Sequence, residues 1–115
     1  MRGLLLRAAG AVLRPSVSLH PPSSEQLSAG DGATLACLLS GYNPPGALVS
    51  WEVDGKEATA GVLTSEEAEK DGLYGRSSTL TLSRASWEQG EVFTCRVSHE
   101  GDTRPTEITR AQCGK

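Results

Sequence analysis

Three cysteines constrain the fold of this 115-residue chain more than any other feature. Because their number is odd, two of them can form an internal disulfide and one is left over. Cys37 and Cys95 are 58 positions apart, and each lies in a stretch where apolar and polar residues alternate. In a secreted protein the third, Cys113, suggests a bond to another chain or a reactive thiol. In a cytosolic protein all three would be ordinary reduced thiols. The rest of the pattern has to decide between these readings.

Short alternating segments separated by turn residues indicate an all-β fold. The alternation predicts strands over residues 15–20, 33–39, 48–53, 73–83, 91–100 and 104–110. Residues 23–29 predict one helical turn capped by Ser23 or Ser24, and residues 84–89 predict a second. Residues 56–63 are weakly patterned, and the charged residues 65–72 are interpreted as a solvated loop. About seven short strands with frequent turns are typical of a sandwich or barrel.

The composition fits a single globular domain and argues against several classes of partner. Apolar residues are 37% and charged residues 22% of the chain, which is ordinary globular usage. A net charge of -3 without a run of like charge argues against nucleic acid or an anionic membrane as partner. No apolar run approaches the roughly 20 residues of a membrane-spanning helix, so we expect no direct membrane insertion.

The two mid-strand cysteines and a tryptophan between them match the pattern of an immunoglobulin sandwich. In that fold a disulfide joins the two sheets, and a tryptophan on an intervening strand packs on it. Trp51 lies in the predicted strand between Cys37 and Cys95, and all three have inward parity. Sheets about 10 Å apart bring facing side chains close enough for a disulfide. The alternative is a pair of buried free cysteines in another β domain.

Four segments resemble the constant domain of antibody light chains. They are residues 15–27 (PSVSLHPPSSEQL), 33–40 (ATLACLLS), 77–83 (SSTLTLS) and 93–101 (FTCRVSHEG). The resemblance implies an all-β fold, a seven-stranded antiparallel constant-type sandwich with Greek-key connections. It also implies a Cys37–Cys95 disulfide with Trp51 packed on it. Trp87 resembles lambda-type chains whereas SEQL and SSTLTLS resemble kappa-type chains, so no isotype is assigned.

Several positions depart from the family pattern. Ser18 and His20 stand where light chains commonly have bulkier residues, and Phe93 replaces the tyrosine of the tyrosine corner, so that hydroxyl bond cannot form. Arg76 stands at a usually apolar position and must escape at the sheet end or find a partner. Asn43-Pro44 replaces an aromatic residue and a cis proline, and we hypothesise a cis bond there.

One outer face of the predicted sandwich lacks charge. Its outward positions on the first, second and fifth strands are Ser18, His20, Thr34, Ala36, Leu38, Gly75, Ser77, Thr79 and Thr81. The other sheet presents Ser50, Glu52, Asp54, Thr94, Arg96 and Ser98. A charge-depleted face is what the centre of a protein interface needs, whereas the alternative is a Ser/Thr-rich surface of a monomer.

The resemblance implies a function in pairing: the constant region of an antibody light chain, secreted or on the cell surface in an antigen receptor. The residues expected to meet the first constant domain of the heavy chain are Ser18, His20, Ala36, Leu38, Ser77 and Thr79. Cys113 is expected to form the interchain disulfide. The alternatives are a surrogate light chain, a constant-type domain of another immune receptor, or a small secreted enzyme or lectin.

The same resemblance divides the chain into three parts. Residues 15–112 are expected to form the constant-type domain, and residues 113–115 a tail with the interchain cysteine. Residues 1–14 are an extension, interpreted either as the stub of a joining region or as a targeting-like segment, since their first 13 residues are basic, apolar and free of acid. They are excluded from the predicted fold.

Nothing in the sequence indicates catalysis. His20 and His99 are the two histidines, and neither has a metal-ligand spacing with the cysteines. His99 shares the inward parity of Cys95, which predicts a partly buried structural histidine. No nucleophile elbow or Gly-rich phosphate loop is present. We therefore expect no enzyme activity, no cofactor, no metal and no small-molecule substrate.

Overall fold

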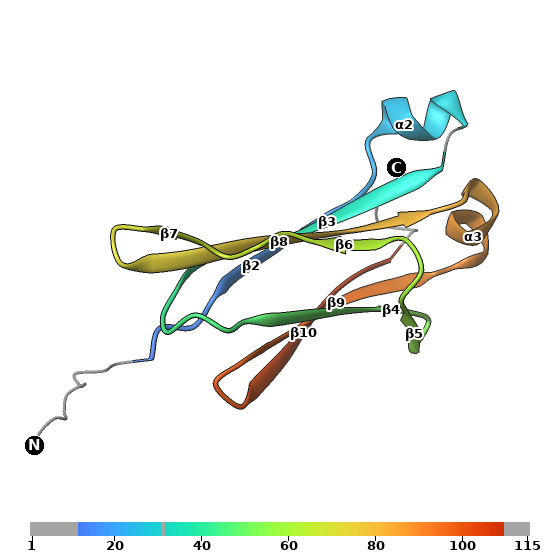
Figure 1. Ribbon diagram of the computed structural model, residues 1–115. Helices are drawn as coiled ribbons and strands as arrows, with labels where there is room; N and C mark the ends of the chain where they lie inside the picture. Colours follow the sequence, from blue (N-terminus) through green and yellow to red (C-terminus); the bar gives the residue numbers. More distant parts are fainter. Residues whose placement is uncertain (1–11, 31, 110–115) are drawn as a thin grey trace, which may run out of the picture.

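The computed structural model describes residues 12–30 and 32–109, which form two antiparallel sheets packed face to face (Figure 1). The five-stranded sheet contains β2 (Ser16–His20), β3 (Ala33–Tyr42), β8 (Leu73–Leu82), β6 (Val62–Thr64) and β7 (Ala68–Lys70). Its order is β2-β3-β8-β6, with β7 also paired to β8. The four-stranded sheet has the order β10-β9-β4-β5, with β10 (Asp102–Thr109), β9 (Val92–His99), β4 (Leu48–Val53) and β5 (Lys56–Ala58).

The predicted constant-type β-sandwich is confirmed. The long strands β3 and β8 pair with each other, as do β4 and β9, so the chain crosses between the sheets from β3 to β4 and from β8 to β9. The described residues contain nine strands where about seven were expected. The difference lies between β4 and β8, where β5, β6 and β7 are three residues each.

Two short helices close one end of the sandwich, and both were predicted. α2 (Ser24–Ala29) begins at Ser23, whose side chain accepts a hydrogen bond from the Gln26 N–H, and it ends at Gly30 in the left-handed conformation. α3 (Arg84–Gln89) is capped in the same way by Ser83. The Gln26 side chain bonds both the N–H and the hydroxyl of Thr34, which joins α2 to the start of β3.

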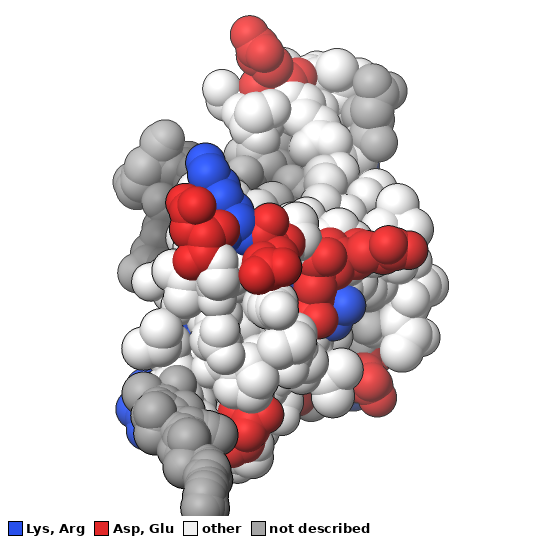
Figure 2. Space-filling model, turned by 60° about the vertical axis from the view of Figure 1, so that its left-hand side comes forward, with Lys and Arg blue, Asp and Glu red and all other residues white. Residues whose placement is uncertain are grey.

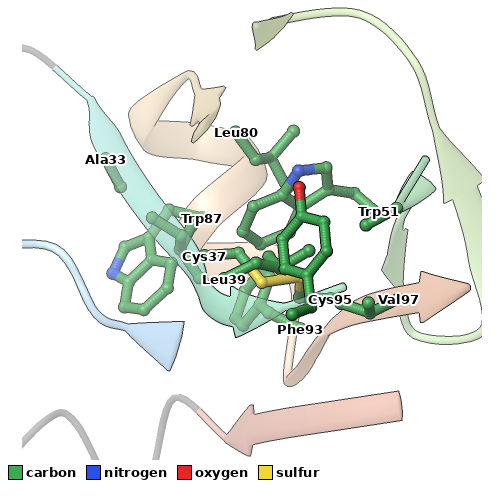
Figure 3. Packing of buried hydrophobic residues seen from close by; sticks show 12 residues of the cluster. Ala33, Cys37, Leu39, Trp51, Leu80, Trp87, Phe93, Cys95 and Val97 are labelled. Carbon is green, nitrogen blue, oxygen red and sulfur yellow. A yellow bond between two sulfur atoms is a disulfide. The ribbon is translucent and has the colours of Figure 1, made fainter. Parts of the chain in front are cut away.

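The core lies between the sheets and contains the expected disulfide (Figure 3). Cys37 on β3 and Cys95 on β9 are bonded with their Cα atoms 6.4 Å apart, so the disulfide joins the two sheets. Trp51 is fully buried and lies opposite Cys95 in the β4–β9 register. Its indole N–H donates to the buried Ser78 hydroxyl at 2.9 Å, which satisfies a polar atom that would otherwise be costly in this core.

Aromatic packing extends the core towards α3. Trp87, on that helix, is 5% exposed and stacks on Phe93 with ring centroids 4.7 Å apart. Phe93 is fully buried, so the residue at the tyrosine-corner position is used for packing. Gly90 leaves room for this ring, because a Cβ there would lie 2.8 Å from it. The end of α3 is thereby held against β9.

Candidate functional site

The outer face of the five-stranded sheet presents the six predicted interface residues together; we call this surface the pairing face. The strand register arranges it in rows. One row runs His20, Ala36, Thr79 and Leu63, and the next runs Ser18, Leu38 and Ser77. Ser18 and His20 are exposed and hydrogen-bonded to each other at 3.0 Å. The two central rows therefore contain no formally charged side chain.

Two leucines give the pairing face its apolar character. Leu38 is 44% exposed on β3, which lies between β2 and β8, and Leu63 is 75% exposed on β6, which ends the sheet order. Leu38 was expected there because β3 alternates clearly. Leu63 was missed, since β6 is three residues long and its stretch of sequence is weakly patterned; its place follows from the pairing Leu63↔Thr79. Both leucines thus expose apolar surface on a face whose central rows are uncharged.

The position of β6 depends on a close contact at Gly61. This residue has φ +81°, and a Cβ there would lie 2.3 Å from the carbonyl oxygen of Thr81. The Thr81 N–H donates to the Gly61 carbonyl at 2.9 Å, so the two backbones meet directly. Only glycine combines this conformation with such close approach. Gly61 thereby sets Leu63 at the edge of the pairing face.

The outer face of the four-stranded sheet is different in character. Arg96 and Glu52 form an ion pair across β4 and β9 at 3.2 Å, and both side chains are partly exposed. Leu48 is the large apolar residue there, at 65% exposure. Thr94, expected among the outward residues, is only 4% exposed because it lies between Glu52 and Glu107 in register. This face has the charged composition of a solvated surface.

A network of hydrogen bonds joins the loop between β3 and β4 to the segment before β7. One carboxylate oxygen of Glu67 accepts from the Tyr42 hydroxyl at 2.7 Å and from the N–H groups of Gly46 and Ala47 at 2.7 and 3.0 Å. Glu67 is half-buried. The interpretation of residues 65–72 as a solvated loop was therefore wrong for Glu67, and residues 68–70 form β7 rather than loop.

The Glu67 carboxyl is held in its charged form. Burial by itself raises the pKa of this group, but the three hydrogen bonds and the nearby Arg76 guanidinium outweigh that effect, so the pKa lies below the usual 4.5. Burial, and next the hydrogen bond to Glu67, raise the pKa of the Tyr42 hydroxyl, which stays a proton donor. The network is thus an acceptor anion surrounded by donors.

The structure tests three predictions about single residues near the loop between β3 and β4. Arg76 finds a partner, because its guanidinium donates to the Ala47 carbonyl. The Asn43-Pro44 bond is cis, as hypothesised. His99 is 4% exposed, and its Nε2 lies 2.8 Å from the Pro44 carbonyl oxygen, which confirms the buried structural histidine. These contacts hold together the end of the domain that contains the loop between β3 and β4.

In the part of the chain that the structure describes, we searched for a metal site and for a membrane-spanning helix. Within residues 12–30 and 32–109, no three His, Cys, Asp or Glu residues are grouped so that they could hold a metal ion. No helix in these ranges is long and apolar enough to cross a membrane. Cys113, the expected interchain cysteine, and residues 1–11 of the expected extension lie outside the described residues.

Comparison with known families agrees with this geometry. The family model described as the immunoglobulin C1-set domain matches residues 17–102, about three quarters of the chain. Domains of this set are generally structural modules without enzymatic activity, and they commonly pair with other immunoglobulin domains. They are typically found outside the cell or on its surface. The match includes both disulfide cysteines and most of the pairing face.

Proposed function

Because the chain belongs to the immunoglobulin C1-set family, we propose that it is the constant region of an antibody light chain. Its role is structural: it pairs with the first constant domain of a heavy chain and catalyses no reaction. The domain proper spans residues 15–112, and it acts in secreted antibody or in an antigen receptor at the cell surface. The segments quoted above that resemble light chains support this choice among C1-set proteins.

The observation that carries the proposal is the contrast between the two outer sheet faces. The pairing face combines uncharged rows with exposed Leu38 and Leu63, whereas the opposite face carries the Arg96–Glu52 ion pair. Removing apolar area from water stabilises association by about 25 cal/mol per Å2. Desolvating charges costs free energy unless they are paired well. Association through the pairing face is therefore favoured over association through the other sheet.

The two exposed leucines supply a matched test of this choice of face. The domain and a heavy-chain first constant domain encoded in the same genome are expressed and purified separately, and one is titrated with the other by calorimetry. Leu38→Asp buries an unpaired charge in the interface, and we expect it to weaken binding by at least about 30-fold, or about 2 kcal/mol. Leu48→Asp makes the same change on the opposite sheet and is expected to leave binding within about twofold. Equal effects of the two variants would refute the proposed face.

The proposed interchain disulfide has its own readout. Mass spectrometry of the co-expressed pair, with and without reduction, detects whether Cys113 is bonded to a heavy-chain cysteine. A Cys113 heterodimer bond is expected, because the third cysteine of the chain is left over once Cys37 and Cys95 are bonded. A free Cys113 together with undetectable pairing would reject the light-chain assignment and leave a C1-set domain with another partner.

A further inference from the structure

His20 is the titratable side chain in the two central rows of the pairing face. It is exposed, and its Nε2 lies 3.0 Å from the hydroxyl oxygen of Ser18. A hydroxyl donates to a neutral imidazole nitrogen or accepts from a protonated one, so this hydrogen bond is compatible with both charge states of the ring. Ala36, opposite His20 on β3, adds no polar side-chain group. The ring can therefore carry a charge in the free domain, where water solvates it.

The strands that carry the central rows provide no carboxylate that would stabilise a charged ring. β2, β3 and β6 contain no Asp, Glu, Lys or Arg. In β8 the charged residue is Arg76, which lies opposite the buried Leu39 and so faces inward. Its guanidinium donates to the Ala47 carbonyl. Within this part of the sheet, a protonated His20 therefore meets no opposite charge.

Two other elements next to β2 carry charges, and these do not pair with His20. β10 contacts β2 and has three charged residues, Asp102, Arg104 and Glu107. Asp102 and Arg104 form an ion pair at 2.7 Å and line a small cavity beside Val17, which packs against the core on the inner side of β2. α2, which follows β2 in the chain, carries the exposed Glu25. Within residues 12–30 and 32–109, no ion pair joins His20 to any of these groups.

The charged side chains at the β7 end of the molecule lie well away from His20. Figure 2 brings this end forward and shows acidic side chains gathered there, with basic ones among them. β7 carries Glu69 and Lys70, and its Ala68 aligns with Ser16 of β2 through β8 and β3. Ser16 is four residues before His20, which is roughly 13 Å along a strand. At physiological ionic strength, salt screens exposed charges beyond about 8 Å, so these groups act weakly on the His20 ring.

A partner that covers Leu38 also takes His20 out of water. Leu38 lies opposite Ser18, so it is the diagonal neighbour of His20 on the same face. Diagonal neighbours of this kind are about 7–8 Å apart, which is well within the area that one domain covers. Burial disfavours the charged form of an imidazole, because a cation loses far more solvation free energy than a neutral ring. Association therefore selects the neutral form of His20.

From these observations we infer that His20 is a pH sensor of the pairing face: the domain binds its partner with the ring neutral, and protonation of the ring weakens the complex. This inference rests on the proposed pairing function and adds regulation by pH to it. Because the free domain binds more protons than the complex, affinity is highest above about pH 7 and declines as pH falls towards about 5.

The size of the effect follows from the fraction of neutral rings. Histidine side chains in peptides titrate near pH 6.5, so about nine rings in ten are neutral at about pH 7.5 and about one in ten at about pH 5.5. When only the neutral form binds, the apparent dissociation constant rises by the inverse of that fraction. We therefore expect the wild-type domain to bind about tenfold more weakly at about pH 5.5 than at about pH 7.5.

Two variants without a titratable ring test the inference. His20→Phe keeps an aromatic ring and His20→Asn keeps a small polar side chain, and His20 is exposed, so neither disturbs the core. Calorimetry with the same heavy-chain first constant domain measures affinity at both pH values, and circular dichroism checks folding at each. We expect the loss of affinity at the lower pH to be about tenfold larger for the wild type than for either variant, which also cancels any titration of the partner.

The number of protons released on binding gives a second readout, which does not depend on how tightly each variant binds. Calorimetry in buffers of different ionisation enthalpy measures this number. At about pH 6 most free histidine rings are protonated, so the wild type should release at least about half a proton more than either variant. Equal proton release by the wild type and both variants would show that His20 keeps its charge state on binding.

Leu38→Asp separates failure of the inference from failure of the proposed function. If Leu38→Asp weakens binding while the wild type and both His20 variants respond equally to pH, the pairing face stands and the role of His20 as a pH sensor is refuted. If the wild type does not bind at the higher pH, or if Leu38→Asp binds as tightly as the wild type, the proposed pairing is refuted and the regulation by His20 is refuted with it.

Discussion

At the scale of single residues, Glu67 shows how one side chain stabilises two loops. Its carboxylate accepts three hydrogen bonds, two of them from consecutive N–H groups of the loop between β3 and β4. Bonds to a charged acceptor are about twice as strong as neutral ones. The loop that contains cis Asn43-Pro44 is therefore tied to the segment preceding β7 by an anion. The free energy of unfolding should therefore depend on pH through the ionisation of Glu67.

Replacing Glu67 with Gln should lower stability in a pH-dependent way. The folded-state pKa of Glu67 lies below its usual value, so the carboxylate contributes stability that is fully present above the unfolded pKa. That contribution is lost as pH falls through the folded pKa. We expect Glu67→Gln to lower the free energy of unfolding by about 1–2 kcal/mol at pH 7, and less below about pH 4.

Urea unfolding at several pH values, followed by tryptophan fluorescence, measures this difference. Glu66→Gln is the control, because the neighbouring exposed Glu66 side chain borders a surface hollow and makes none of the three bonds. A difference between wild type and Glu67→Gln that stays constant from pH 7 to about pH 3 would contradict the assigned role of the anion.

At the scale of secondary-structure elements, the short strand β6 contributes an exposed leucine to the pairing face. Its three residues place Leu63 on the pairing face, and its attachment begins at the contact between Gly61 and Thr81. The short strand has little burial of its own, since Leu63 and Thr64 are exposed. Its position is thus set by backbone contact with β8 together with Val62, which packs against the core, and the Thr64 hydroxyl, which is hydrogen-bonded to Ser78.

Gly61→Ala should displace β6 from β8. A methyl group 2.3 Å from the Thr81 carbonyl forces the backbones apart, in addition to the strain of a positive φ. We expect a loss of about 2–4 kcal/mol of stability, measured by thermal or urea unfolding. Gly55→Ala is the matched control: Gly55 has φ +84° but nothing within 4 Å, so it should lose only about 1 kcal/mol. Equal losses would show that the close contact is unimportant.

At the scale of the whole molecule, the Cys37–Cys95 disulfide holds the two sheets together around a core of modest size. It closes a loop of 58 residues, and β3 and β9 belong to different sheets. A cross-link of this length restricts the unfolded chain, which stabilises the folded state by about 4 kcal/mol in the chain-entropy model. Both cysteines are fully buried beside Trp51, so removal also leaves a void.

The double variant Cys37→Ala/Cys95→Ala should therefore lose about 2–5 kcal/mol in free energy of unfolding. Guanidinium unfolding of the variant, compared with the oxidised wild type, measures the loss. Reduced wild type is the control that keeps both sulfur atoms in the core but lacks the bond. A double variant as stable as the oxidised protein would mean that packing between the sheets suffices without the cross-link.

Local residue patterns were sufficient to predict the fold class. Alternation along β3, β4 and β9 placed Cys37, Trp51 and Cys95 inward, and the same alternation put Ala36 and Leu38 on the opposite face. Period-two patterning works for these strands because each is six to ten residues long and half-buried. A serine cap likewise predicted α2, and a turn before Gly90 predicted α3, whose Ser83 cap the structure adds.

Alternation of apolar and polar residues was enough to predict short strands, the inward parity of Cys37 and Cys95 and the uncharged character of one face, because these depend on neighbours two residues apart. The constant-type sandwich and the Cys37–Cys95 disulfide followed from the resemblance to light-chain constant domains. The role of Glu67, whose bonds reach 20 to 25 positions along the chain, and the place of Leu63 beside Thr79 depend on tertiary contacts. Such features arise from long-range pairing, which no local period encodes.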